Sequence, residues 1–237
     1  MRLIMIRHPK TEANERKMVY GWTDSLYSEA GKATIPGIVR GLHDVKIDRI
    51  YSSPLTRTRL LAEAIAADHG PAAPDQPTGC AAPDIVIDDR IKEMNFGKFE
   101  NMTIPELEEK YPVEFSEYRK NFNDCIVPGG ESFRQLSERT VAFLQDIYDR
   151  HEKGIDYCKD DDGWPAQGTV SEKKKEETIV VVSHSMVIHA AIGYLMGFDL
   201  DDVWRVKVEP GSMIDFDWRY DYAMLQSLNG LFNVRKP

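Results

Sequence analysis

The chain has 237 residues, with 30 Lys plus Arg against 39 Asp plus Glu and a net charge of −9 at pH 7. Nucleic-acid-binding proteins need a basic face to neutralise phosphates, so this balance argues against that class, although a cavity inside an acidic protein can be locally positive. No apolar stretch approaches the about 20 residues that span a bilayer, and the N-terminus carries no signal-peptide pattern. We therefore expect neither nucleic acid nor membrane as a partner.

The first part of the chain predicts two strands, each followed by a helix. Residues 2–6 are apolar and too few for a helix, so they predict a short buried strand. Residues 29–43 look helical in their second half, with Pro36 near the helix start. Residues 45–55 alternate in polarity and then run into Ser-Ser-Pro, which predicts a strand leading into a loop. Residues 55–68 have the composition and apolar spacing of a helix.

The middle of the chain predicts one strand and two helices. Residues 69–84 hold four prolines and two glycines, so we interpret them as a surface insertion. Residues 85–89 resemble another strand. Residues 103–122 are amphipathic and helix-like, with an interruption at Pro112. Residues 129–153 are the longest helical candidate, with a continuous apolar stripe.

The last part begins with a second predicted insertion at residues 154–177. An apolar strand at 178–183, a helix at 186–197 and two outer strands at 213–218 and 224–229 follow. Strands that alternate with helices predict an α/β protein whose mostly parallel sheet is covered on both faces. The sequence shows no internal repeat and no linker, so we expect one domain over 1–237.

Basic and acidic side chains follow the predicted strands where each one ends. Arg7 and His8 follow the first strand, His184 follows the strand at 178–183, and Arg57 and Glu93 follow the other two. Ligands of open α/β sheets bind in the crevice outside the carboxyl ends of the strands. The sequence therefore predicts that these five side chains converge on one rim of the sheet.

This set of side chains has the chemistry of phosphoryl transfer. Arginine offers a planar fork that suits phosphate oxygens. A neutral histidine can accept a phosphoryl group on nitrogen, and a second histidine, if protonated, can share the charge. A carboxylic acid can protonate the leaving oxygen and later activate water. Phosphoryl transfer needs mainly positioning and charge neutralisation, so we expect neither a metal nor another cofactor.

The remaining histidines are expected to be structural. His43, His69 and His151 lie away from the strand ends and have no chemical partner in the pattern. His189 lies five residues after His184, a spacing that does not place both on one face of a helix.

The three cysteines, Cys80, Cys125 and Cys158, form no Cys-x-x-Cys pair, which argues against a disulfide framework or a zinc site. We therefore expect a cytoplasmic protein.

Five motifs in the same order resemble those of the histidine phosphatase superfamily, in its phosphoglycerate-mutase-like branch. They are Arg-His-Pro-Lys-Thr-Glu-Ala-Asn at 7–14, Ser-Ser-Pro-Leu-Thr-Arg at 52–57, Glu-Met-Asn-Phe-Gly-Lys-Phe-Glu at 93–100, Gly-Gly-Glu-Ser at 129–132 and Val-Ser-His-Ser at 182–185. The resemblance implies a three-layer α/β/α sandwich and a phosphohistidine mechanism. In it His8 is the nucleophile, Glu93 is the acid and base, and Arg7, Arg57 and His184 form the phosphate pocket.

The resemblance also implies further contacts to the substrate. They are Thr11, Asn14, Tyr20, Gly21 and Ser185. Ser185 is itself a departure, because the family has glycine after each of its two histidines.

Pro9 is the other departure, since it follows His8 where the family has glycine. Proline has no backbone N–H, so one donor is lost if that amide normally holds the phosphate or the turn. Serine keeps its N–H, but glycine allows a closer approach or a positive φ. Every side chain of the chemical set is present, so we expect these changes to retune activity rather than abolish it.

The resemblance leaves three functions open. The first is a metal-independent phosphomonoesterase that hydrolyses a small phosphorylated metabolite. The second is a mutase of the phosphoglycerate type, but the interval between Glu93 and 129–132 is short and lacks the extra basic residues that a bisphosphorylated ligand favours. The third is a catalytically weak phosphate-binding protein. Phosphatase is favoured, with a nucleoside phosphate of the cobalamin pathway, a sugar phosphate and a phosphoglycerate as open substrates. The oligomeric state is also open.

Overall fold

The computed structural model describes residues 1–70, 81–152, 176–219 and 222–229, and its centre is a six-stranded sheet with the order β4-β3-β6-β1-β7-β8. The strands are β1 (Arg2–Arg7), β3 (Arg49–Ser52), β4 (Ile85–Ile87), β6 (Thr178–Ser183), β7 (Met213–Arg219) and β8 (Tyr222–Asn229). The first four strands of that order are parallel, and β7 and β8 add antiparallel pairs beside β1. The predicted mostly parallel α/β sheet is confirmed.

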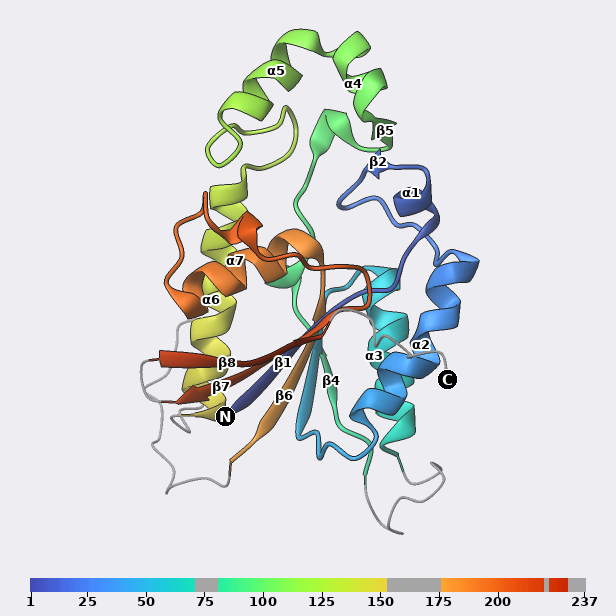
Figure 1. Cartoon of the computed structure of the whole chain (residues 1–237), viewed down its shortest axis with the longest axis vertical. Helices are drawn as coiled ribbons and strands as arrows, with labels where there is room; N and C mark the ends of the chain where they lie inside the picture. The colour runs from blue at the N-terminus through green and yellow to red at the C-terminus, as the bar shows by residue number, and fades with distance from the viewer. Residues whose placement is uncertain (71–80, 153–175, 220–221, 230–237) are drawn as a thin grey trace, which may run out of the picture.

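Helices cover both faces of this sheet, as Figure 1 shows. They are α2 (Glu29–Leu42) and α3 (Thr56–Asp68) on one face, and α6 (Phe133–His151) and α7 (Ser185–Met196) on the other. Leu3 and Met5 of β1 join the core cluster that contains the buried side chains of α6 and α7. Ile4 and Ile6, which point the opposite way, join the cluster of α2 and α3. Burial on both faces explains why this strand is apolar throughout.

A small cap lies beyond the carboxyl end of β1 (Figure 1). It consists of α4 (Ile104–Lys110), α5 (Pro112–Lys120) and the antiparallel pair of β2 (Met18–Val19) and β5 (Met102–Thr103). The predicted interruption of the helix at Pro112 is confirmed, because Pro112 is the first residue of α5 and Tyr111 separates the two helices. A proline is favourable there since its missing N–H has no partner within the helix.

The other short elements are α1 (Glu12–Glu15) and the 3₁₀ helices η1 (Asp89–Ile91), η2 (Gly97–Phe99) and η3 (Val203–Arg205). The predicted strand at 85–89 is therefore shorter than expected. The carboxylate of Asp88 accepts the backbone N–H of Arg90 and caps η1, which ends the strand at Ile87. Among the described residues, no helix is both long and apolar enough to cross a membrane.

The prediction that Pro36 lies near the start of its helix is wrong. Helix α2 begins at Glu29, and Pro36 lies inside it. The Ser28 hydroxyl accepts the backbone N–H of Gly31 at 3.1 Å and so caps the true start. Burial of Ile38 and Leu42 stabilises the helix beyond the proline, which removes one hydrogen bond.

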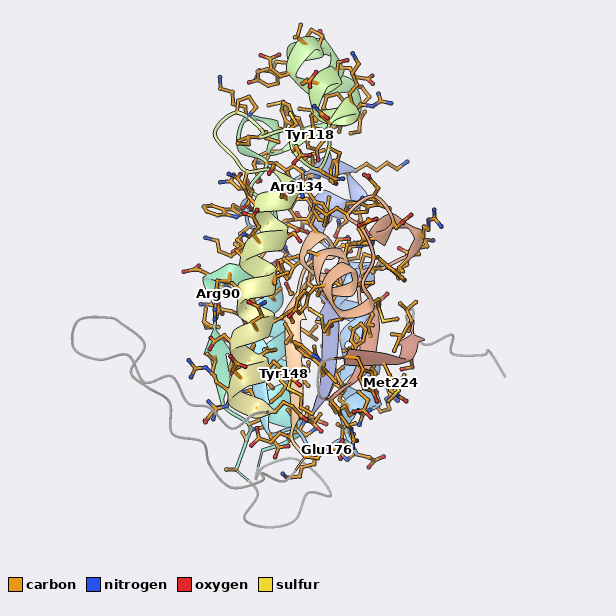
Figure 2. All side chains as sticks on the ribbon, turned by 90° about the vertical axis from the view of Figure 1, so that its left-hand side faces the viewer. Arg90, Tyr118, Arg134, Tyr148, Glu176 and Met224 are labelled. Atoms are coloured by element: carbon orange, nitrogen blue, oxygen red, sulfur yellow. The ribbon has the colours of Figure 1, made fainter. Side chains whose placement is uncertain are left out.

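The long helix α6 extends from the cap end of the molecule along the sheet, with Arg134 near one end and Tyr148 near the other (Figure 2). It begins at Phe133 rather than at 129, because Ser132 and Gln135 form a reciprocal capping box. Residues 71–80 and 154–175 of the two predicted insertions, with Cys80 and Cys158, lie outside the described residues, as does residue 153 of the predicted helix. The single-domain assignment stays a prediction.

Candidate active site

The register of the parallel strands brings the predicted site residues to one edge of the sheet. Arg7 at the end of β1 is paired with Ser183 at the end of β6, and Ser52 at the end of β3 is paired with Val182. The residues that follow these ends, His8 and His184, have ring centroids 5.3 Å apart. Two segments that are far apart in the sequence therefore place their histidines side by side.

His8 is held in one tautomer by the carbonyl of the next residue. Its side chain is buried, and its Nδ1 lies 2.7 Å from the carbonyl oxygen of Pro9. A carbonyl oxygen only accepts, so Nδ1 carries the proton and Nε2 keeps its lone pair. Burial, together with the charges of Arg57 and Arg7, lowers the pKa of His8 well below 6.5. His8 is thus a neutral imidazole with a nucleophilic Nε2.

This contact gives Pro9 a role that the sequence did not reveal. The group that orients His8 is the Pro9 carbonyl, and proline keeps its carbonyl although it lacks an N–H. The backbone N–H of His8 is bound in turn to the carbonyl of Ser183 at 3.0 Å. The substitution of glycine by proline therefore leaves the orientation of the histidine intact.

His184 is fully buried beside His8, and its Nε2 lies 2.8 Å from the hydroxyl of Ser53. Burial and the charge of Arg57 lower its pKa well below 6.5. The protonated form considered from the sequence is therefore not the form in the free protein. If the Ser53 hydroxyl donates to Nε2, the proton of the neutral ring lies on Nδ1, which has no hydrogen-bond partner in the described protein.

Arg57 is fully buried and Arg7 is half-buried. Arg57 donates from Nη1 to the carbonyl of Thr23 and from Nη2 to that of Gly21, and its guanidinium lies over the ring of Tyr20 at 4.9 Å. Arg7 donates from Nη1 to the carbonyl of Val208 at 2.6 Å. The Nε atoms of both arginines are buried without a partner among the described residues. Buried donors without an acceptor are costly, so these groups are suited to an anion.

Glu93 is the buried carboxyl group of the site. It is only 7 % exposed, and one oxygen accepts the backbone N–H of Met94 at 3.0 Å. Burial raises the pKa of Glu93 above 4.5, although Arg57 and Arg7 oppose the shift. A carboxyl group with a raised pKa retains its proton more readily and is suited to donate it to a leaving oxygen.

A cavity of about 720 Å³ connects these groups with the cap. Its deep side is lined by Arg7, His8, Asn14, Tyr20, Glu93 and Ser185, and its cap side by Phe96, Ile104, Glu108, Phe115, Tyr118 and Arg119, with Met18, Val19 and Met186 completing the wall. Arg57 and His184 are buried and do not line it. Asn14, Tyr20 and Ser185 thus lie where the expected substrate contacts require.

Thr11 and Gly21, which were also expected to contact the substrate, lie behind the cavity wall. The hydroxyl of Thr11 is bonded to the hydroxyl of Tyr20 and to the side chain of Asn14. Gly21 packs so closely that a Cβ there would lie 1.7 Å from the carbonyl oxygen of Met94. Thr11 therefore supports residues that line the cavity, and Gly21 permits a close approach of two backbones.

Two supporting groups were not predicted from the sequence. Arg139 donates to the carbonyls of Arg90, Lys92 and Glu93, and its guanidinium is paired with Glu131 at 2.7 Å. This pair fixes the segment that carries Glu93. The Gly-Gly-Glu-Ser motif identified Glu131, but no local pattern links it to an arginine eight residues further on.

The second supporting group is Glu100, whose carboxylate accepts four backbone N–H groups. The donors are Gly21, Trp22, Thr23 and Phe96, at 2.9–3.1 Å. The same loop offers two carbonyls to Arg57. Glu100 therefore shapes the loop that binds the arginine.

Comparison with known proteins identifies the family. The sequence model of the histidine phosphatase superfamily (branch 1) matches residues 3–155 and 164–230. The chain belongs to this superfamily. The match confirms the family that the five sequence motifs indicated.

Several members of the superfamily are similar over more than half of the chain. Phosphoserine phosphatase 1 of Hydrogenobacter thermophilus is 29 % identical over 212 residues, which are 90 % of this chain and 84 % of that protein. The probable phosphoglycerate mutase GpmB of Escherichia coli is 30 % identical over 63 % of this chain and 64 % of its own length. The crystal structure of a putative alpha-ribazole-5′-P phosphatase from Escherichia coli superposes with a TM-score of 0.77 at 23 % identity, covering 97 % of this chain and 96 % of that one. This last likeness shows the shared histidine phosphatase fold.

Proposed function

We propose that this histidine phosphatase hydrolyses phosphate monoesters of small metabolites through a phosphohistidine on His8. One observation carries the proposal: a buried, neutral His8 lies in a cluster with Arg7, Arg57 and His184, each of which has a side-chain nitrogen without a hydrogen-bond partner among the described residues. The phosphatases among the relatives, which include phosphoserine phosphatase 1, support the same activity.

In the first step His8 Nε2 attacks phosphorus, and the bond to the alcohol oxygen breaks. The Glu93 carboxyl group donates its proton to that oxygen, so the alcohol leaves neutral. Arg7 lines the cavity and donates to the phosphoryl oxygens, and we propose that Arg57 and His184, which are buried in the same cluster, also donate once the phosphate is bound at His8. The products of this step are the alcohol, phosphohistidine and a Glu93 carboxylate.

In the second step water attacks the phosphohistidine. Glu93, now a carboxylate, removes a proton from the water, the N–P bond breaks, and inorganic phosphate and neutral His8 are released. Asn14, Tyr20 and Ser185 line the cavity and are proposed substrate contacts. No step requires a metal or an organic cofactor. We also propose that the enzyme is cytoplasmic, which the cysteine pattern supports. The net charge of −9 supports a small molecule, rather than a nucleic acid, as its substrate.

The test is hydrolysis of an aryl phosphate in excess chelator by the wild type and by His8→Ala. We expect chelator-resistant release of phosphate by the wild type, none by the variant, and an acid-labile, base-stable phosphoprotein after rapid quenching. Activity that survives in His8→Ala contradicts the mechanism. Transfer between the positions of phosphoglycerate, without net hydrolysis, would identify a mutase instead, and the absence of any turnover would identify a phosphate-binding protein.

A further inference from the structure

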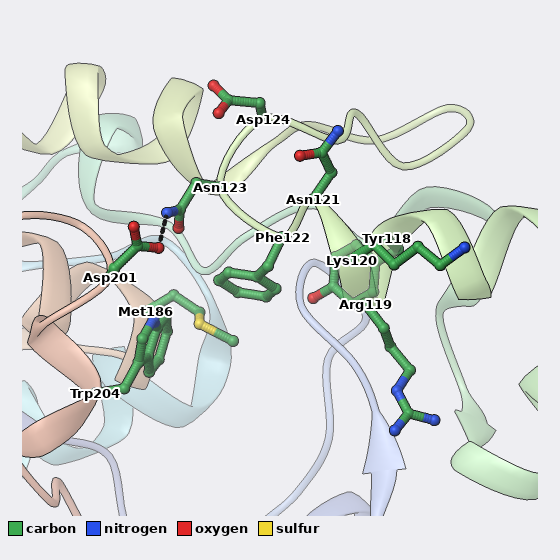
Figure 3. Close-up of a pocket in the computed structure, with 10 residues that line it drawn as sticks. All are labelled: Tyr118, Arg119, Lys120, Asn121, Phe122, Asn123, Asp124, Met186, Asp201 and Trp204. Carbon is green, nitrogen blue, oxygen red and sulfur yellow. Dashed lines mark hydrogen bonds between the residues drawn. The ribbon is translucent and has the colours of Figure 1, made fainter.

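A second cavity of about 680 Å³ lies next to the catalytic one. Figure 3 shows its lining, which comes from the end of α5 and the loop after it, from α7 and from the segment around η3. Tyr118, Arg119 and Met186 line both cavities. The two cavities are therefore adjacent, with these three residues at their common boundary.

One wall of the second cavity is aromatic and rigid. The rings of Phe122 and Trp204 meet edge to face, with centroids 5.2 Å apart. Trp204 also packs on Phe133 at 5.0 Å and on His189 at 4.6 Å, yet it remains 38 % exposed. The ring nitrogens of His189 lie 2.7 Å and 3.0 Å from the carbonyl oxygens of Ser185 and Val206, and its ring packs on Trp204, so His189 supports this wall. A fixed and accessible indole is suited to stack on a flat or ring-shaped group.

Two polar groups beside this wall, Asn123 and Asp201, carry acceptor oxygens. Asn123 donates from its amide to Oδ1 of Asp201 at 2.6 Å, as the dashed line in Figure 3 marks. The Oδ1 of Asn123 is buried without a partner, and Oδ2 of Asp201 has no hydrogen bond within the described residues. Carboxylate oxygens accept hydrogen bonds, and Asp201 is exposed, so it is suited to a ligand that donates.

Two of the neighbouring charges form ion pairs, and Lys120 adds a further positive charge to the lining. Arg119 is bound to Glu108 at 3.0 Å, and Asp124 is bound to Arg134. The hydrogen-bond partner of Asp201 among the described residues is the neutral amide of Asn123, although the charge of Arg134 also acts on Asp201. An aromatic face beside a carboxylate acceptor is the chemistry that recognises a ring with several hydroxyl groups.

We propose that the second cavity binds the alcohol part of the substrate, and that the preferred substrates are phosphate monoesters of hydroxylated ring compounds, that is, of glycosides or nucleosides. The ring stacks on Trp204 while its hydroxyls donate to Asp201. This inference rests on the proposed phosphatase function. A compact ester such as phosphoserine fills the catalytic cavity alone and makes no use of the second one.

The test compares kcat/KM for two extended probes, adenosine 5′-monophosphate and trehalose 6-phosphate, with that for O-phosphoserine. In the wild type we expect at least one extended probe to be hydrolysed more than about tenfold more efficiently than O-phosphoserine, since that ratio corresponds to about 1.4 kcal/mol. The probe that is preferred distinguishes a nucleoside from a glycoside. Asp201→Asn, which keeps the shape and removes the charge, is expected to reduce the ratio of extended to compact substrate at least fivefold.

Trp204→Leu is expected to reduce the same ratio and to raise KM for the extended probe more than it lowers kcat. Asp199→Asn is the matched control, because Asp199 is exposed in the same segment and does not line the cavity. Equal efficiency on all three substrates, or equal losses on all of them in Asp201→Asn, overturns the subsite. Failure of the phosphatase proposal itself is separate, since it appears as a lack of His8-dependent release from an aryl phosphate.

Discussion

The Nδ1 atom of His8 lies 2.7 Å from the carbonyl oxygen of Pro9, and this contact fixes which nitrogen of the ring is nucleophilic. Every residue type has this carbonyl, so the contact does not depend on the proline ring. Pro9 only restricts the backbone around it.

Pro9→Gly is therefore expected to keep kcat within about threefold of the wild type, or within about 0.7 kcal/mol of barrier. We expect its stability to fall by about 0.4–1 kcal/mol, because glycine increases the conformational entropy of the unfolded chain. Steady-state kinetics and urea unfolding measure both. A folded Pro9→Gly protein with kcat reduced more than about tenfold contradicts a role limited to the carbonyl.

Glu100→Gln is expected to lower kcat/KM by about tenfold or more. The amide replaces one acceptor oxygen by a donor that faces four backbone N–H groups, and an unsatisfied buried donor costs about 1–3 kcal/mol. Because the loop that Glu100 holds also binds Arg57, inhibition by inorganic phosphate should weaken in parallel with the loss of kcat/KM.

Glu109→Gln is the matched control for that experiment, since Glu109 is exposed on α4 and does not line the catalytic cavity. Its kinetics are expected to equal those of the wild type. A Glu100→Gln enzyme that is less stable, but has unchanged inhibition by phosphate, would show that Glu100 has no influence on Arg57.

The pH profile of kcat/KM is expected to be bell-shaped. His8 must be neutral, and its pKa lies well below 6.5, so activity rises with pH through that lowered pKa. Glu93 must be protonated in the first step, and its pKa lies above 4.5, so activity falls with pH through that raised pKa. Glu93→Gln should lose the alkaline limb and keep the acid limb. An unchanged alkaline limb in this variant would assign it to another group, such as the substrate phosphate.

Stability is expected to fall as the pH is lowered from 7 to 5. His8 and His184 are neutral in the folded protein because burial lowers both pKa values, whereas in the unfolded chain they bind protons below 6.5. The unfolded state therefore binds more protons, so the free energy of unfolding decreases as the pH falls. A histidine that stays neutral in the folded state down to pH 5 contributes about 2 kcal/mol to this decrease.

His184→Asn removes one of these two groups, so its stability should change less between pH 7 and pH 5 than that of the wild type. Urea unfolding of both proteins at the two pH values measures the difference. Equal pH dependence of the two proteins would mean that His184 is already charged in the folded state.

Local patterns in the sequence determined the chemical set and most of the elements. The buried strand at 2–6, the apolar strand at 178–183 and the break at Pro112 were predictable because side-chain periodicity and proline geometry act over a few residues. His8 and His184 could be assigned to one rim because parallel strands end at a common edge of the sheet. The start of α2, which Ser28 caps eight residues before Pro36, was missed because the sequence alone does not show that burial of the apolar face outweighs one lost hydrogen bond.

Only the tertiary structure decided how these groups are tuned. The tautomer of His8 depends on the path of the backbone at Pro9, and the partner of His184 is Ser53, which lies 131 residues away in the sequence. Glu100 reaches Gly21 across 79 residues, and Asn123 reaches Asp201 across 78. Such contacts leave no local pattern, because the sheet register and the packing of the cap set them. Local sequence patterns thus specify which chemical groups are present, while long-range packing sets their protonation states and the shape of both cavities.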